Sequence, residues 1–89
     1  MRQRDAAMND LQRIPYIGPQ GAADLERAGF MTVESLKGQD PEDIYMRDNL
    51  AKGYVDTRVA LYVYRLAVAW AESDGCLPDD KRHWWQYKN

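Results

Sequence analysis

The residues that carry most metal chemistry are few in this sequence, and their spacing matches no established site. His83 is the single histidine, and Cys76, Asp79 and Asp80 lie within seven positions of it. Zinc sites use three or four protein ligands, mainly histidine and cysteine, at recognisable spacing. Only one histidine and one cysteine are present, so we predict no metal site. We expect these side chains to be solvated residues of the C-terminal tail.

Two pairs of adjacent acids, Glu42-Asp43 and Asp79-Asp80, are the candidates for acid-base chemistry. Adjacent residues on a helix point in different directions, whereas a general acid and a general base must converge on one substrate. Negative charge in the first turn of a helix explains both pairs more simply. No serine, cysteine or lysine lies in a nucleophile motif, and no glycine-rich loop cradles a phosphate. We therefore predict no catalytic residues, no cofactor and no enzymatic activity.

A turn at residues 16–21 offers binding chemistry instead. Gly18-Pro19 can start a helix, because proline at the first helical position gives up no N–H group that the helix needs. The backbone N–H groups of Gly18, Gln20 and Gly21 then lie free at a helix N-terminus, where they suit a phosphate or a carboxylate. The candidate DNA-backbone-binding residues are Tyr16, Ile17, Gly18, Pro19, Gln20 and Gly21.

The segment around this turn, LQRIPYIGPQGAADL at residues 11–25, resembles a helix-hairpin-helix motif, in which two short helices flank a tight turn of glycine and apolar residues. Leu11 and Ile14 of the first helix are expected to pack against Ala22 and Leu25 of the second, with Ile17 filling the turn.

Two positions depart from this motif. Tyr16 stands where the motif has its first glycine and where a positive φ is unfavourable for a side chain, and Gln20 stands where a basic residue often reaches a phosphate. Two alternatives follow, a hairpin that contacts DNA and a purely structural connection between two helices.

The aromatic tail, residues 78–89, contains a second group of candidate binding residues. Indole rings are unfavourable in water and useful for stacking on bases or anchoring a protein partner. Trp84 and Trp85 are therefore candidate partner-binding residues. The alternative is that the tail folds back and adds these two rings to a small core.

The pattern of helix starts and stops predicts an all-α fold, a compact bundle of about five short helices in a single domain over residues 1–89. Asp40-Pro41 gives the clearest start, because it combines an N-cap acid with a proline at the first helical position. Asp56 is expected to cap a long core helix. The expected elements are a hairpin at about 5–28 with helices 5–13 and 19–28, a short turn at 32–36, a helix at 41–51, the core helix at about 57–72, and a last turn in the tail.

Composition and charge limit the partners. The chain has 89 residues, 12 Lys+Arg and 14 Asp+Glu, for a net charge of −2, and neither end is a basic arm. Binding to DNA would therefore be weak and salt-sensitive. The longest apolar run, residues 59–71, is interrupted by Arg65 and is shorter than the roughly 20 residues that cross a bilayer. The single cysteine and the absence of an apolar stretch behind Met1 predict a cytoplasmic protein that binds no membrane.

The rest of the chain is similar to a known family. The run at residues 25–45, then Val55-Asp56, the run at residues 61–65 and the closing Trp84-Trp85 resemble the bacterial pathogenicity-locus family, some of whose members are labelled mitomycin resistance proteins. The resemblance covers roughly residues 8–87. It implies a small helical fold of the SAM-like type and suggests DNA binding through the hairpin.

Taken together, these features predict a non-catalytic, sequence-nonspecific DNA-binding module that uses the hairpin backbone on phosphates. The alternative is a protein–protein interaction module in which the hairpin is structural. Its candidate faces are the acidic surface from Asp40 to Asp48 and the tryptophan pair.

Overall fold

The computed structural model describes residues 10–88 of the chain. This part is all-helical, as predicted, and contains no strand. Its three α-helices are α1 (Pro19–Arg27), α2 (Pro41–Lys52) and α3 (Arg58–Glu72), and four short 3-10 helices are η1 (Asp10–Arg13), η2 (Glu34–Leu36), η3 (Asp79–Lys81) and η4 (Trp84–Tyr87).

Helix α2 begins and ends at the signals in the sequence. The Asp40 side chain accepts a hydrogen bond from the Glu42 N–H, with Pro41 in the first turn, and α2 ends at Gly53, whose φ is +83°. This left-handed conformation is nearly free of strain only for glycine. The predictions for α2 and α3 are correct to within one residue at each end.

Asp56 does not cap α3, contrary to the prediction. The N-cap residue is Thr57, and the Asp56 carboxylate instead contacts Lys52 and accepts a hydrogen bond from the Thr57 N–H. An ion pair with a nearly buried ammonium is stronger than a cap bond, and it directs this side chain back toward α2.

The first arm of the hairpin is shorter than an α-helix in the part that is described. Residues 5–9 of the helix expected at 5–13 lie outside the described residues, and its remainder forms the single 3-10 turn η1. The expected packing is nevertheless present. Leu11, Ile14, Ala22 and Leu25 are each at most 1% exposed and belong to one core cluster.

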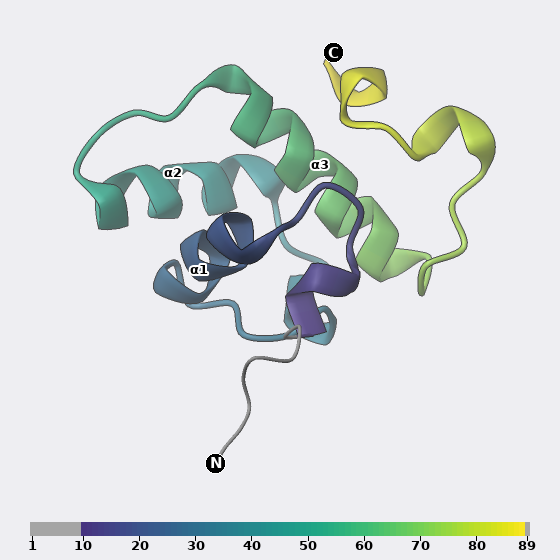
Figure 1. The fold of residues 1–89 in the computed structure, drawn as a ribbon, viewed down its shortest axis with the longest axis horizontal. Coiled ribbons are helices and arrows are strands. Elements are labelled where there is room, and N and C mark those ends of the chain that lie inside the picture. Colours follow the sequence, from purple (N-terminus) through teal and green to yellow (C-terminus); the bar gives the residue numbers. More distant parts are fainter. Residues whose placement is uncertain (1–9, 89) are drawn as a thin grey trace.

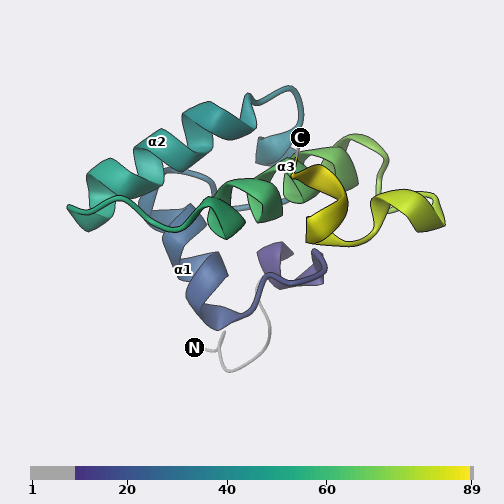
Figure 2. The same cartoon turned by 90° about the horizontal axis from the view of Figure 1, so that it is seen from above.

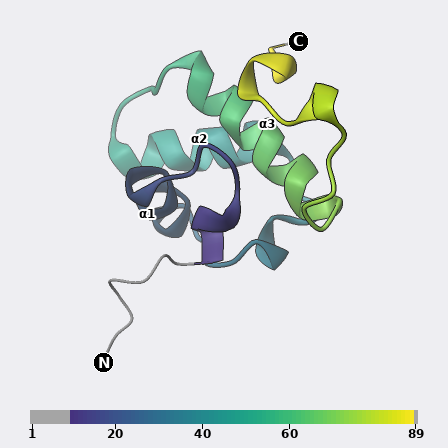
Figure 3. The ribbon, with the colours of Figure 1, turned by 45° about the vertical axis from the view of Figure 1, so that its right-hand side comes forward.

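The central element of the fold is α3, which crosses α2 (Figures 1 and 3) and also packs against η4. Its buried side chains include Leu61, Tyr64, Leu66 and Ala67. Removing such residues from water supplies about 25 cal/mol per Å² of apolar surface, which is the main favourable term in a domain of this size.

The tail folds back along α3. The Arg65 side chain donates a hydrogen bond to the Tyr87 carbonyl at 2.7 Å, and the Trp84 ring is stacked parallel to Tyr62 with centroids 6.4 Å apart. Seen from above, η4 lies beside α3 (Figure 2). Within residues 10–88, every helix is too short or too polar to span a bilayer.

Candidate nucleic-acid interface

The turn before α1 is built around a left-handed tyrosine. Tyr16 has a φ of +69°, the conformation that glycine adopts at this position of a helix-hairpin-helix motif. A non-glycine residue in this region loses roughly 1–2 kcal/mol to steric crowding. The turn therefore holds a tyrosine in a backbone conformation that is nearly free of strain only for glycine.

Gly18 is the N-cap residue of α1, and the first turn of this helix has no side-chain cap. The N–H groups of Gln20 and Gly21 belong to that first turn and have no acceptor within the helix. Both Gly18 and Gln20 are exposed. An anion at this exposed start of α1 could meet these donors and the positive end of the helix dipole.

The chain itself does not require glycine at position 18. Its φ is −93°, and a Cβ atom placed there would have nothing within 4 Å. At Gly21, a Cβ atom would touch the Ile17 side chain at 3.5 Å, an ordinary contact. Ile17 is 4% exposed and fills the turn from the core side, so it supports the surface without being part of it.

Gln20 is already engaged within the chain. Its side-chain amide donates a hydrogen bond to Oδ1 of Asp24 at 3.0 Å, and the Arg27 guanidinium donates to the same oxygen at 3.0 Å. Neither side chain is therefore directed freely at an external phosphate.

Tyr16 connects the turn to the tail, a contact that no pattern in the sequence predicts. Its hydroxyl shares a hydrogen bond with Nδ1 of His83, and its ring meets the Trp85 ring edge-on with centroids 6.0 Å apart. His83 and Trp85 are themselves stacked at 4.5 Å and 3°. The two groups of predicted site residues, the turn and the tryptophan pair, thus meet at one place in the fold.

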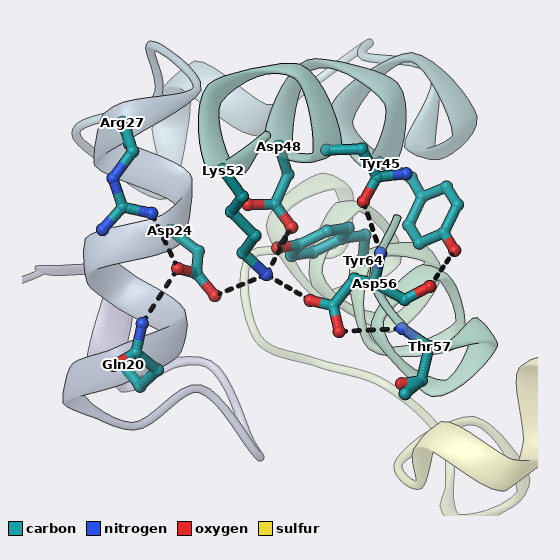
Figure 4. Close-up of polar contacts among 10 residues, drawn as sticks. Gln20, Asp24, Arg27, Tyr45, Asp48, Lys52, Asp56, Thr57 and Tyr64 are labelled. Atoms are coloured by element: carbon teal, nitrogen blue, oxygen red, sulfur yellow. Dashed lines mark hydrogen bonds and ion pairs between the residues drawn. The ribbon is translucent and has the colours of Figure 1, made fainter. Parts of the chain in front are cut away.

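A nearly buried ionic cluster holds α1, α2 and the α2–α3 loop together (Figure 4). Nζ of Lys52 lies 3.2 Å from Oδ2 of Asp24 and 3.1 Å from Oδ2 of Asp48, and it also contacts Asp56. The Tyr64 hydroxyl donates to Oδ2 of Asp48 at 2.8 Å. Because the Asp48 side chain is fully buried, the acidic surface predicted for residues 40–48 does not include it.

The ionic cluster shifts the pKa values of its members. Burial alone would lower the pKa of Lys52, but its hydrogen bonds to Asp56, Asp48 and Asp24 outweigh this effect and raise it. The Lys52 ammonium in turn lowers the pKa of Asp56. Burial, followed by the hydrogen bond to Asp48, raises the pKa of Tyr64.

Carboxylate oxygens of Asp24, Asp48 and Asp56 lie within 4.8 Å of one another, a spacing that could hold a metal ion. The Lys52 ammonium lies among these oxygens and supplies a positive charge from the chain itself. The arrangement is therefore best explained as a structural ion cluster.

Sequence reasoning missed this cluster, although it contains a signal. Asp48, Lys52 and Asp56 are spaced four residues apart, which resembles an ordinary ion-pair ladder on the surface of a helix. Asp24 joins the cluster from α1, far away in the sequence, so the spacing of residues within α2 does not predict this contact.

The fold and its site define a class, a small all-helical domain whose hairpin turn exposes the start of a helix beside an aromatic tail. The family model described as Pathogenicity locus matches residues 4–89, so the chain belongs to that family. No curated protein and no solved structure matches the chain.

Proposed function

We propose that this chain is a non-catalytic, sequence-nonspecific DNA-binding module that holds phosphates with the backbone of the turn at residues 16–21. The observation that carries the proposal is the start of α1, where no side chain caps the first turn and where Gly18 and Gln20 are exposed. Contacts of this type position a strand through its backbone and read no base sequence.

The proposal treats residues 10–27 as a variant helix-hairpin-helix within a SAM-like fold. The positive φ of Tyr16 at the motif's first glycine position supports it, as does the packing of Leu11 and Ile14 in one cluster with Leu25. A reducing compartment such as the cytoplasm fits the single cysteine, and DNA is accessible there.

Affinity for duplex DNA should be low, because the cations nearest the turn are paired within the chain. Arg27 is bound to Asp24, and Arg13 is paired with Asp10. With about two phosphates contacted, the slope of log K against log salt should be no steeper than about −2, and Kd should lie at about 10⁻⁴ to 10⁻⁶ M.

The test is fluorescence polarisation of the full chain with a labelled blunt duplex at about 50 to 200 mM salt. The key variant is Gly18→Asp. An aspartate at the N-cap would accept hydrogen bonds from the first-turn N–H groups and stabilise α1 by a few tenths of a kcal/mol, about the difference between a glycine cap and an aspartate cap. It would also place a negative charge where the phosphate is proposed to lie. DNA binding should be lost while thermal stability is unchanged or higher.

Gly18→Ala is the matched control. Its methyl group enters open space and leaves the N–H groups free, so the folded variant should bind DNA as the wild type does. Equal affinity of Gly18→Asp and wild type would reject the turn as the binding site. A folded wild type that binds no DNA at about 50 mM salt would reject the function.

A protein-interaction module is the second candidate, and one observation favours it. Leu50 on α2 is 81% exposed and Val55 in the following loop is 78% exposed, and Met46, Tyr54 and Val59 are exposed as well. Clusters of exposed apolar residues often mark protein-binding surfaces. Apolar contacts persist at salt concentrations that screen phosphate contacts, so the same salt series distinguishes the two functions.

A further inference from the structure

Three rings form what we call the aromatic face, consisting of Tyr16, His83 and Trp85. The tyrosine comes from the turn at residues 16–21 and the other two from the tail. Although the tail packs against the domain, Tyr16 remains 47% exposed and Trp85 remains 49% exposed. The fold therefore keeps two large rings half in water, at the surface already proposed to meet DNA.

These rings are held in fixed orientations. His83 shares a hydrogen bond with the Tyr16 hydroxyl through Nδ1, and its backbone N–H donates to the side chain of Gln86 at 2.8 Å. Trp84, the neighbour of Trp85 in the chain, is anchored by stacking on Tyr62. A ring that is already fixed loses little conformational entropy when it binds a ligand.

The Trp85 ring is in contact with three other rings and is still partly in solvent. His83 covers one face of the indole at 4.5 Å, whereas Tyr16 and Trp84 meet it at 67° and 83°. About half of the side chain is in solvent. Planar, sequence-independent ligands such as nucleobases stack on rings presented in this way.

The segment that carries His83 and Trp85 also carries three cations, of which Arg82 is paired with Asp79 at 3.5 Å. Residues 81–88 contain Lys81, Arg82 and Lys88 and no acidic residue, and all three cations are exposed. Aromatic rings interleaved with cations are typical of surfaces that bind single-stranded nucleic acid. This segment is the most basic short stretch of a chain that is otherwise acidic overall.

The aromatic face also adjoins the turn. Tyr16 belongs to the face and precedes Gly18 by two residues, so the two Cα atoms are at most about 7 Å apart. A strand with a phosphate at the start of α1 would therefore have a neighbouring base within reach of the rings.

We propose that the aromatic face stacks on an unpaired base of a DNA strand whose phosphate is held by the turn at residues 16–21. This inference rests on the proposed function and specifies its substrate class as DNA with an unpaired base. In a blunt duplex every internal base is stacked between its neighbours and would first have to leave the helix, which costs a few kcal/mol. An already unpaired base avoids that cost.

The experiment measures binding of the full chain to two DNAs, a blunt duplex and the same duplex with a single unpaired 2-aminopurine inserted at its centre. Polarisation measures affinity. The 2-aminopurine fluorescence reports stacking of the unpaired base directly, with the wild-type chain and without any substitution. We expect about tenfold tighter binding to the DNA with the unpaired base, which corresponds to stacking of one base, and a fall in 2-aminopurine fluorescence.

Trp85→Ala should abolish this preference for the DNA with the unpaired base, and Trp85→Phe should retain part of it. Leu50→Ala is the matched control, because it removes an exposed apolar side chain from α2 and should leave the preference intact. Urea unfolding confirms that each variant is folded under the binding conditions.

Equal affinity for the two DNAs with unchanged 2-aminopurine fluorescence would overturn the stacking inference. The proposed function would survive that result if binding to the blunt duplex were still lost in Gly18→Asp. Absence of binding to both DNAs would overturn the inference and the proposed function together.

Discussion

The Tyr16 hydroxyl and Nδ1 of His83 share a hydrogen bond that links residues 67 positions apart. It joins the hairpin turn to the C-terminal tail. The backbone of Tyr16 is strained by its positive φ, and the ring contacts with His83 and Trp85 offset that strain, since an aromatic pair is worth about 0.5–1.5 kcal/mol beyond its buried area. The ring contacts of Tyr16 therefore stabilise the fold, whereas its backbone conformation destabilises it.

Replacing Tyr16 separates these two contributions. Tyr16→Ala and Tyr16→Gly both remove the ring, but only alanine keeps the strain of φ +69°. We expect both variants to be less stable than the wild type, with Tyr16→Gly more stable than Tyr16→Ala by about 1 kcal/mol. Urea unfolding of the two variants measures this difference. If alanine were the better substitute, the turn would not hold a left-handed residue in solution.

Lys52→Met tests the ionic cluster. The substitution leaves the carboxylates of Asp24, Asp48 and Asp56 close together without their common cation. Breaking a buried ion pair by removing one partner costs about 3–5 kcal/mol, a large part of the stability of a small domain. Chemical unfolding should show this loss, and adding Asp56→Asn should recover part of it by reducing the repulsion.

Lys37→Met serves as the control for that experiment. Lys37 pairs with Glu34 at 3.2 Å and with Asp74 at 2.8 Å, and both partners are exposed. Exposed ion pairs contribute little to stability, so unfolding of this variant should resemble that of the wild type. If Lys37→Met lowered the free energy of unfolding as much as Lys52→Met does, burial of the ion pair would not explain the importance of Lys52.

The α-helices could be predicted because their ends are encoded locally. Asp40 and Pro41 specify the start of α2, and Gly53 specifies its end, through bonds that span a few residues. The apolar stripe of α3 likewise identified the core helix. The first hairpin arm was predicted as an α-helix from the same kind of pattern, but residues 10–13 form a 3-10 turn.

Contacts between distant segments could not be predicted in this way. Neither the meeting of Tyr16 with His83 nor the approach of Asp24 to Lys52 has a periodic signature, because each depends on how packed helices place two surfaces. The tail illustrates the limit. The sequence leaves two alternatives for the tryptophan pair, a tail that folds back onto the domain and a tail that binds a partner. The structure combines them, because Trp84 is stacked on Tyr62 and Trp85 is still half exposed.

Acid should destabilise the fold through two carboxylates. The Val33 N–H and then Arg13 lower the pKa of Asp10, and Lys52 lowers the pKa of Asp56. A depressed folded-state pKa stabilises the protein above the unfolded value of 3.8, and this contribution is lost as pH falls through the folded-state values. The free energy of unfolding should therefore drop below about pH 4. The difference between wild type and Asp10→Asn should be largest near pH 6 and shrink toward pH 2, and a constant difference would contradict this assignment.

Asp40→Ala should affect stability and leave binding intact. The Asp40 carboxylate accepts the Glu42 N–H at 3.0 Å, and loss of such a cap costs about 1 kcal/mol. Thermal melting should show this decrease, whereas DNA affinity per folded molecule should stay the same. Reduced affinity at unchanged stability would instead identify the start of α2 as part of an interface.

Gln20→Lys tests the electrostatics of the turn, with Gln20→Glu as its opposite. A lysine beside a bound phosphate adds one contact that favours every DNA sequence equally, and a full contact would steepen the salt slope by about 0.9. Gln20 donates to Asp24 four residues later, so a lysine there is also drawn toward that carboxylate. We therefore expect tighter binding with a change in slope below about 0.9, and weaker binding for Gln20→Glu. Polarisation titrations at several salt concentrations measure both quantities. If the two variants bind duplex DNA with the same affinity, no phosphate lies near position 20, and the turn serves only to connect η1 with α1.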